Sequence, residues 1–144
     1  MLREGSLPPF SASVQPPSGK SILVIDDEHW ILDLASELVR AEGHEVETAL
    51  GGTHAIQKLA HQKFDLIVTD WKMPGLNGIG FYEHLRATDA AAARRVVFMT
   101  GDVVNETFQL FLREHQLTCL AKPFARREFR AAISTVTGSA IARN

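Results

Sequence analysis

Short apolar runs that each end in a polar side chain are the feature that most constrains how this chain can fold. Residues 66–68 are rich in branched side chains, as expected of a strand buried on both faces, and they lead into Thr69 and Asp70. Residues 73–78 then contain Pro and Gly and predict a loop. Taken alone, this run leaves Asp70 either as a functional carboxylate or as a cap of the next element.

Other runs repeat this pattern and make the functional interpretation stronger. They are residues 21–25, followed by Asp26 and Asp27, residues 96–99, followed by Thr100, and residues 119–121, followed by Lys122. In open parallel sheets, ligands bind beyond the carboxyl ends of the strands. Parallel strands would therefore bring three carboxylates, a hydroxyl and an ammonium to one edge of a sheet.

Helical patterns separate the predicted strands. Residues 45–49 alternate weakly and predict one more strand, Gly43 favours a helix end before it, and the alanine-rich residues 87–93 fit either a helical tail or a loop. Helical spacing is seen in the apolar groups Ile31, Leu34, Ala35 and Leu38; Ala55, Ile56, Leu59 and Ala60; Phe81, Tyr82 and Leu85; Val104, Phe108, Phe111 and Leu112; and Phe129, Ala132, Ile133 and Val136. Strands and helices that alternate with short connections predict an α/β fold, with helices on both faces of a parallel sheet.

The ordered set of polar strand ends resembles the pattern of response-regulator receiver domains. The resemblance extends from Lys20 to about Val136 and is carried by Asp26, Asp27, Asp70, Thr100 and Lys122-Pro123-Phe124. It implies a flavodoxin-like, doubly wound, five-stranded sheet with strand order 2-1-3-4-5, and a cis peptide bond before Pro123. We expect a receiver domain over residues 20–137, preceded by a flexible Pro- and Ser-rich arm (1–19) and followed by a short tail (138–144).

The resemblance also implies a reaction. Asp70 would accept a phosphoryl group from a phosphohistidine on a sensor histidine kinase or a histidine phosphotransfer protein. Lys122 and Thr100 would contact the phosphoryl oxygens. Considered singly, Lys122 is better explained as a solvated surface lysine and Thr100 as an ordinary strand residue, and only the joint pattern with the acids favours the functional roles.

A divalent metal is expected beside Asp70. Two carboxylates 4 Å apart repel by roughly 4 kcal/mol at an effective dielectric near 20, and oxygen ligands with waters suit Mg²⁺. By resemblance, Asp27 and Asp70 would bind Mg²⁺ directly, Asp26 mostly through water, and Lys72 through its backbone carbonyl. The alternative role for Asp26 and Asp27 is capping of the following helix.

One position departs from the family pattern. The family usually has an aromatic residue three positions before the lysine, where this chain has Cys119. We therefore expect no threonine–aromatic switch of the usual kind, and little change in the helix and strand surfaces around Cys119 on phosphorylation. We also expect Lys72 and Asp102 to form an ion pair that slows hydrolysis of the phosphoryl group.

Composition excludes several classes of function. The 144 residues suit one domain, and a net charge of −2 with pI near 6.3 does not favour nucleic-acid binding. The single cysteine excludes an internal disulfide, and no apolar run reaches the length of a membrane span or of a signal peptide's apolar core. A cytoplasmic protein without membrane insertion is expected. The Pro-rich arm and the short tail favour the C-terminal receiver of a hybrid sensor kinase, with no output domain behind it.

Two other functions stay open at this point. An aspartyl-phosphate hydrolase would need a second acid two residues after Asp70, where Lys72 stands. A receiver-like assembly module that is never phosphorylated would not need the full set of polar strand ends. We expect no enzyme activity beyond the chain's own phosphorylation and dephosphorylation.

Overall fold

A parallel sheet forms the centre of the protein. The computed structural model describes residues 19–101 and 105–137, and its strands are arranged in the order β2-β1-β3-β4-β5. The strands are β1 (Ser21–Ile25), β2 (Glu45–Ala49), β3 (Leu66–Asp70), β4 (Val96–Thr100) and β5 (Thr118–Ala121). The predicted sheet and strand order are confirmed. The expected arm, except Gly19, and the expected tail lie outside the described residues, as do Asp102 and Val104.

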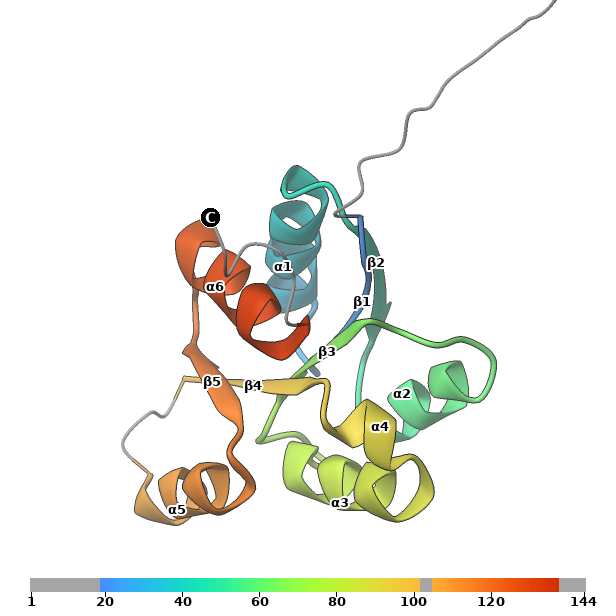
Figure 1. Ribbon diagram of the computed structural model, residues 1–144, viewed down its shortest axis with the longest axis vertical. Coiled ribbons are helices and arrows are strands. Elements are labelled where there is room, and N and C mark those ends of the chain that lie inside the picture. The colour runs from blue at the N-terminus through green and yellow to red at the C-terminus, as the bar shows by residue number, and fades with distance from the viewer. Residues whose placement is uncertain (1–18, 102–104, 138–144) are drawn as a thin grey trace, which may run out of the picture.

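Helices cover both faces of the sheet (Figure 1). They are α1 (His29–Ala41), α2 (Gly52–Leu59), α3 (Gly78–Thr88), α4 (Ala90–Ala93), α5 (Glu106–His115) and α6 (Arg126–Thr137). Helices α1 and α6 lie on one face, and the other four lie on the opposite face. The alanine-rich segment is neither a plain helical tail nor a loop: α3 ends at Thr88, and the Asp89 side chain accepts a hydrogen bond from Ala92 N (3.1 Å) to begin the short α4.

The central strands are apolar because they are buried on both sides. Every residue of β3 and β4 is buried, and alternation along the strands divides them between two core clusters. Ile67 and Phe98 pack with α3 and α5, whereas Val68 and Met99 pack with α1 and α6. Burying each such side chain stabilises the fold by about 1.5–3 kcal/mol, so the core fixes the strand ends firmly.

The predicted apolar stripe of α1 is partly wrong. Leu34 is exposed, whereas Leu32 and Val39 are buried beside Ile31 and Ala35. The buried face of α1 includes Leu32 and Val39, which pack into the cluster beneath α6, and Leu38 lies partly buried against that cluster.

An ion-pair cluster joins the end of α1 to α6. Glu42 accepts hydrogen bonds from Arg126 Nε (2.9 Å) and Arg130 Nε (2.9 Å). The hydrogen bond from Arg130 is the main cause that lowers the Glu42 pKa to about 2, and Arg126 adds to it against the opposing effect of burial. Exposed pairs of this kind contribute about 0–1 kcal/mol each, so the cluster orients α6 more than it stabilises the fold.

Gly78 allows α3 to begin directly against the end of β3. Its backbone N–H donates to the Trp71 carbonyl at 3.1 Å. A Cβ at this position would collide with the Asp70 carbonyl oxygen and would lie 2.7 Å from the Trp71 Cα. The neighbouring atoms are backbone, so they cannot yield by a rotamer change.

Gly78→Ala is therefore expected to lower the free energy of unfolding by about 1–3 kcal/mol, the usual cost of overpacking. Gly51→Ala is the matched control, since Gly51 has an extended backbone and a Cβ there meets no atom of the described residues within 4 Å. Urea unfolding of both variants measures the difference. Equal stabilities would contradict the close packing at Gly78.

Candidate functional site

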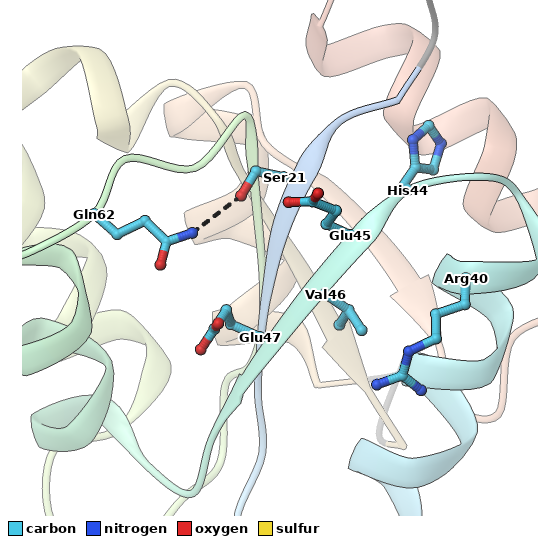
Figure 2. A pocket seen from close by; sticks show the side chains of 7 residues that line it. All are labelled: Ser21, Arg40, His44, Glu45, Val46, Glu47 and Gln62. Carbon is cyan, nitrogen blue, oxygen red and sulfur yellow. Dashed lines mark hydrogen bonds between the residues drawn. The ribbon is translucent and has the colours of Figure 1, made fainter. Parts of the chain in front are cut away.

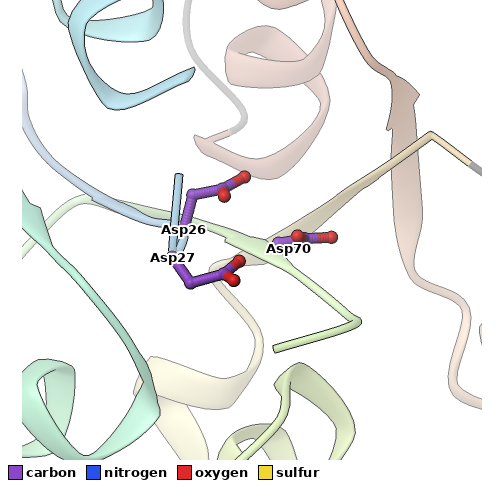
Figure 3. A group of neighbouring side chains, drawn as sticks. All are labelled: Asp26, Asp27 and Asp70. Carbon is purple, nitrogen blue, oxygen red and sulfur yellow. The ribbon is translucent and has the colours of Figure 1, made fainter. Parts of the chain in front are cut away.

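Carboxylates from two neighbouring strands meet at the carboxyl edge of the sheet. Asp70 is the last residue of β3, and Asp26 and Asp27 follow β1, which pairs with β3 in parallel. Each of the three side chains offers an oxygen within 4.8 Å of the other two, and Figure 3 shows them side by side. Asp26 and Asp70 are buried, whereas Asp27 is exposed. The structure thus brings the three predicted acids together, with one of them open to solvent.

Lys122 lies between the two buried acids. Its Nζ is 3.0 Å from Asp26 Oδ2 and 3.1 Å from Asp70 Oδ2, and its side chain is 11% exposed. Glu28 Oε1 lies further from the same ammonium, at 3.5 Å. The peptide bond between Lys122 and Pro123 is cis, as the resemblance implied. Lys122 is therefore part of the acidic site and not a solvated surface lysine.

Backbone groups orient the two buried carboxylates. Asp26 Oδ1 accepts a hydrogen bond from Glu28 N (2.8 Å), and Asp70 Oδ1 accepts a longer one from Lys72 N (3.4 Å). The N-cap residue of α1 is Glu28. Capping is thus not the main role of the acids after β1, and Asp26 points toward Lys122 instead.

The protonation states follow from burial and charge. Burial raises the pKa of Asp70 and of Asp26, against the lowering effect of Lys122, and each also feels the charge of a neighbouring acid. Burial works against the charged form of Lys122, but its hydrogen bond to Asp26 and the charge of Asp70 outweigh this and raise its pKa. The site therefore holds a firmly charged ammonium between carboxylates that are costly to ionise.

Thr100, at the end of β4, is buried. Its hydrogen-bond partner is a residue that the sequence analysis did not assign to the site. Trp71 Nε1 donates a hydrogen bond to Thr100 Oγ1 at 2.8 Å. The available signal was the position of Trp71, a large aromatic directly after Asp70 in a segment otherwise typical of a loop.

Cys119 lies on β5 in register with Phe98, beside the same core cluster as Trp71. Burial, with a contribution from the charge of Asp70, raises the pKa of its thiol to about 11. Cys119 is therefore a partly buried residue that packs against the core, and its raised pKa disfavours the reactive thiolate.

The ammonium of Lys72 lies near the ring of Trp71. Its Nζ lies 5.1 Å from the centroid of the Trp71 ring, in a cation–π contact. Asp102 lies outside the described residues, so its ion pair with Lys72 stays a prediction. The role of the Lys72 carbonyl as a metal ligand also stays a prediction.

A hollow elsewhere on the protein is unrelated to the acidic site. Figure 2 shows it beside β2, lined by Ser21, Arg40, His44, Glu45, Val46, Glu47 and Gln62. Ser21 and Glu45 are the first residues of their strands, at the amino edge of the sheet. Asp26, Asp70, Thr100 and Lys122 lie at the opposite, carboxyl edge.

The sequence as a whole matches a known family. Residues 22–134 match the model of the response regulator receiver domain. The chain belongs to this family. As a receiver domain, it is a phosphoacceptor module of two-component phosphorelay signalling, and the comparisons do not favour the hydrolase or the assembly module.

Individual relatives agree with this assignment. The chain is 31% identical over 118 residues to sporulation initiation phosphotransferase F of Bacillus subtilis, covering 79% of this chain and 90% of the relative. It is 34% identical over 117 residues to a transcriptional regulatory protein CpxR homolog of Haemophilus influenzae, covering 80% of this chain but 49% of that protein. The chain therefore spans about half the length of that regulator.

Solved structures share the fold. The response regulator protein TrrA of Thermotoga maritima, in complex with Mg²⁺-BeF, aligns with a TM-score of 0.70 at 27% identity, covering 81% of this chain and 98% of TrrA. Within the described residues, no helix has the length and apolar character needed to cross a membrane. The expected cytoplasmic location and the placement in a hybrid kinase stay predictions.

The raised pKa of Asp70 predicts a pH-dependent cost to stability. When the pKa of an acid is higher in the folded than in the unfolded chain, ionisation of that acid destabilises the fold. The free energy of unfolding therefore falls as the pH rises from the pKa of the unfolded chain through that of the folded chain. In metal-free buffer, Asp70→Asn is therefore expected to have a larger free energy of unfolding than the parent at pH 7. The difference should shrink as the pH falls toward 4, the ordinary range of a carboxyl pKa. Urea unfolding at several pH values is the measurement, and a less stable Asp70→Asn at pH 7 would contradict it.

Proposed function

We propose that Asp70 accepts a phosphoryl group from a phosphohistidine of a sensor histidine kinase or a histidine phosphotransfer protein. The observation that carries this proposal is the ammonium of Lys122 held between the buried carboxylates of Asp26 and Asp70, at 3.0 and 3.1 Å. A buried ion pair that merely stabilised the fold would need one carboxylate, and two acids with a third beside them leave an excess of negative charge. That excess suits a metal and a reaction on phosphorus.

The step follows from the chemistry of a carboxylate. An oxygen of Asp70 attacks the phosphorus, the phosphorus–nitrogen bond of the donor breaks, and the bonding electrons return to the donor's imidazole. Charge spreads over the three transferring oxygens, so the protein acts by positioning and by supplying cations. Lys122 is already in contact with Asp70 and can move from Asp26 to a phosphoryl oxygen without crossing the site. Thr100 supplies a hydroxyl from the neighbouring strand.

The residues at the site fit Mg²⁺. Asp26, Asp27 and Asp70 offer oxygen ligands within 4.8 Å of one another, and the exposed Asp27 leaves the site open to water, which Mg²⁺ retains when bound. Bound Mg²⁺ would neutralise charge on the transferring phosphoryl group. The magnesium complex of TrrA supports this proposal by analogy. In this account the chain releases no product of its own and acts on its own phosphoryl group only.

Phosphorylation is expected at Asp70. Incubation with acetyl phosphate and Mg²⁺ should add one phosphoryl group to the parent, seen as a mass increase, and Asp70→Asn should abolish it. Asp33→Asn, which changes an exposed acid on α1, is the matched control and should be labelled like the parent. The adduct should be labile.

The same experiment separates the alternatives. Continuous release of a product without an adduct would indicate a hydrolase, and no change in mass would indicate an assembly module. Labelling that persists in Asp70→Asn and is lost in a variant of Asp26 or Asp27 would move the acceptor to another acid.

Magnesium is expected to stabilise the folded protein through Asp27. A ligand present at about 100 times its dissociation constant adds about 2.7 kcal/mol to the free energy of unfolding. Thermal unfolding of the parent and of Asp33→Ala should show this increase with Mg²⁺. Asp27→Ala should show little of it, and an equal increase in Asp27→Ala would refute the proposed ligand.

A further inference from the structure

The hydroxyl of Thr100 is held on the face of the sheet opposite to Asp70. Asp70 pairs in register with Met99, so the two share one face, and Thr100, the next residue, belongs to the other. On that other face, Trp71 Nε1 donates to Thr100 Oγ1 at 2.8 Å. Thr100 is 2% exposed, so this hydrogen bond lies largely away from water.

The same indole also contacts α5. The ring of Trp71 stacks on Phe108, with centroids 4.4 Å apart and planes 7° apart. Phe108 is fully buried in the first turns of α5, and it also meets Phe98 of β4 edge-on at 5.5 Å. Trp71 is thus one rigid group that contacts the Thr100 hydroxyl at its polar end and a core residue of α5 on its face.

This arrangement changes what Cys119 implies. With no aromatic at position 119, the sequence predicts no aromatic link between Thr100 and the helix surface. In the structure, that link comes from the segment after β3, and Cys119 packs against the same cluster as Trp71. The described contacts therefore connect Thr100 to α5 through Trp71, without an aromatic residue at position 119.

Building on the function proposed above, we propose that Trp71 is a positioning residue that holds Thr100 in the unphosphorylated state and couples it to α5. When the Thr100 hydroxyl turns to donate to a phosphoryl oxygen on Asp70, its bond from the indole breaks. The indole then changes its stacking on Phe108, and α5 shifts with Phe108. Binding of the phosphoryl group and the position of α5 are linked through this one side chain.

The test uses a variant that keeps the ring and loses the N–H. Trp71→Phe can still stack on Phe108 but cannot bond Thr100, so the unphosphorylated state loses a stabilising contact. A ligand that favours the other state then binds more tightly. Beryllofluoride with Mg²⁺, used as the probe, is expected to bind Trp71→Phe about fivefold more tightly than the parent, the equivalent of one ordinary hydrogen bond.

Two controls separate this role from a general structural one. Trp30→Phe makes the same change at a tryptophan that is 57% exposed and should bind beryllofluoride like the parent. In a Thr100→Val background, which lacks the hydroxyl, Trp71→Phe should have no further effect on affinity. Unchanged or weaker binding by Trp71→Phe overturns the proposal, as does a full effect that persists in Thr100→Val.

A second readout is NMR, and its first comparison needs neither a phosphoryl group nor a mimic of one. In ¹H–¹⁵N spectra of the metal-free protein, Thr100→Val should move the indole resonance of Trp71 and leave that of Trp30 unchanged. In the parent, beryllofluoride should move the Trp71 indole and the Phe108 amide together, and Trp71→Ala should lose the Phe108 response. A parent that fails to bind beryllofluoride would refute the proposed function, whereas a Trp71 indole indifferent to Thr100→Val would refute this inference alone.

Discussion

A buried ammonium between two buried carboxylates is the constraint on which the site depends. Lys122 contacts Asp26 and Asp70, and both acids are 5% exposed or less. Removing ions from water costs several kcal/mol each, and loss of Lys122 would leave both buried carboxylates uncompensated, at a typical cost of about 3–5 kcal/mol. Any exchange of partners by Lys122 therefore has to keep the total charge nearly balanced. An arriving phosphoryl group and a divalent cation do this together.

The fold supplies the energy that holds this arrangement. Strands β3 and β4 are buried along their whole length, and the packing of helices on both faces fixes where they end. At the start of α3, Gly78 lies so close to the backbone of Asp70 and Trp71 that a Cβ would not fit there. The acids are thus unfavourable locally, as their raised pKa values indicate, and are tolerated because the surrounding core is stable. Stability and reactivity are opposed at the same residues.

Much of the fold could be predicted because its signals are local and repeated. The apolar runs identified the strands, and the ordered polar ends identified Asp26, Asp27, Asp70 and Lys122 as one site. The face of α1 was predicted imperfectly, because Leu34 fits the helical spacing as well as the buried Leu32 does, and tertiary packing decides between them.

The partner of Thr100 could not be predicted from the sequence, because it depends on how a loop residue folds back against a helix. Nothing in the spacing of Trp71 and Phe108 shows that their rings stack. The absence of an aromatic at Cys119 suggested that the link between Thr100 and the helices was lost, whereas the structure supplies it from another element. The contacts between Thr100 and α5 therefore could not be predicted from position 119 alone.

A crystal structure of the protein with Mg²⁺ and beryllofluoride tests the central claim most directly. The account predicts beryllium bonded to a carboxylate oxygen of Asp70, Mg²⁺ beside Asp27, and the ammonium of Lys122 moved onto a fluorine atom. Beryllium on a different acid, or Lys122 still bridging Asp26 and Asp70 with the fluoride group bound, would contradict it.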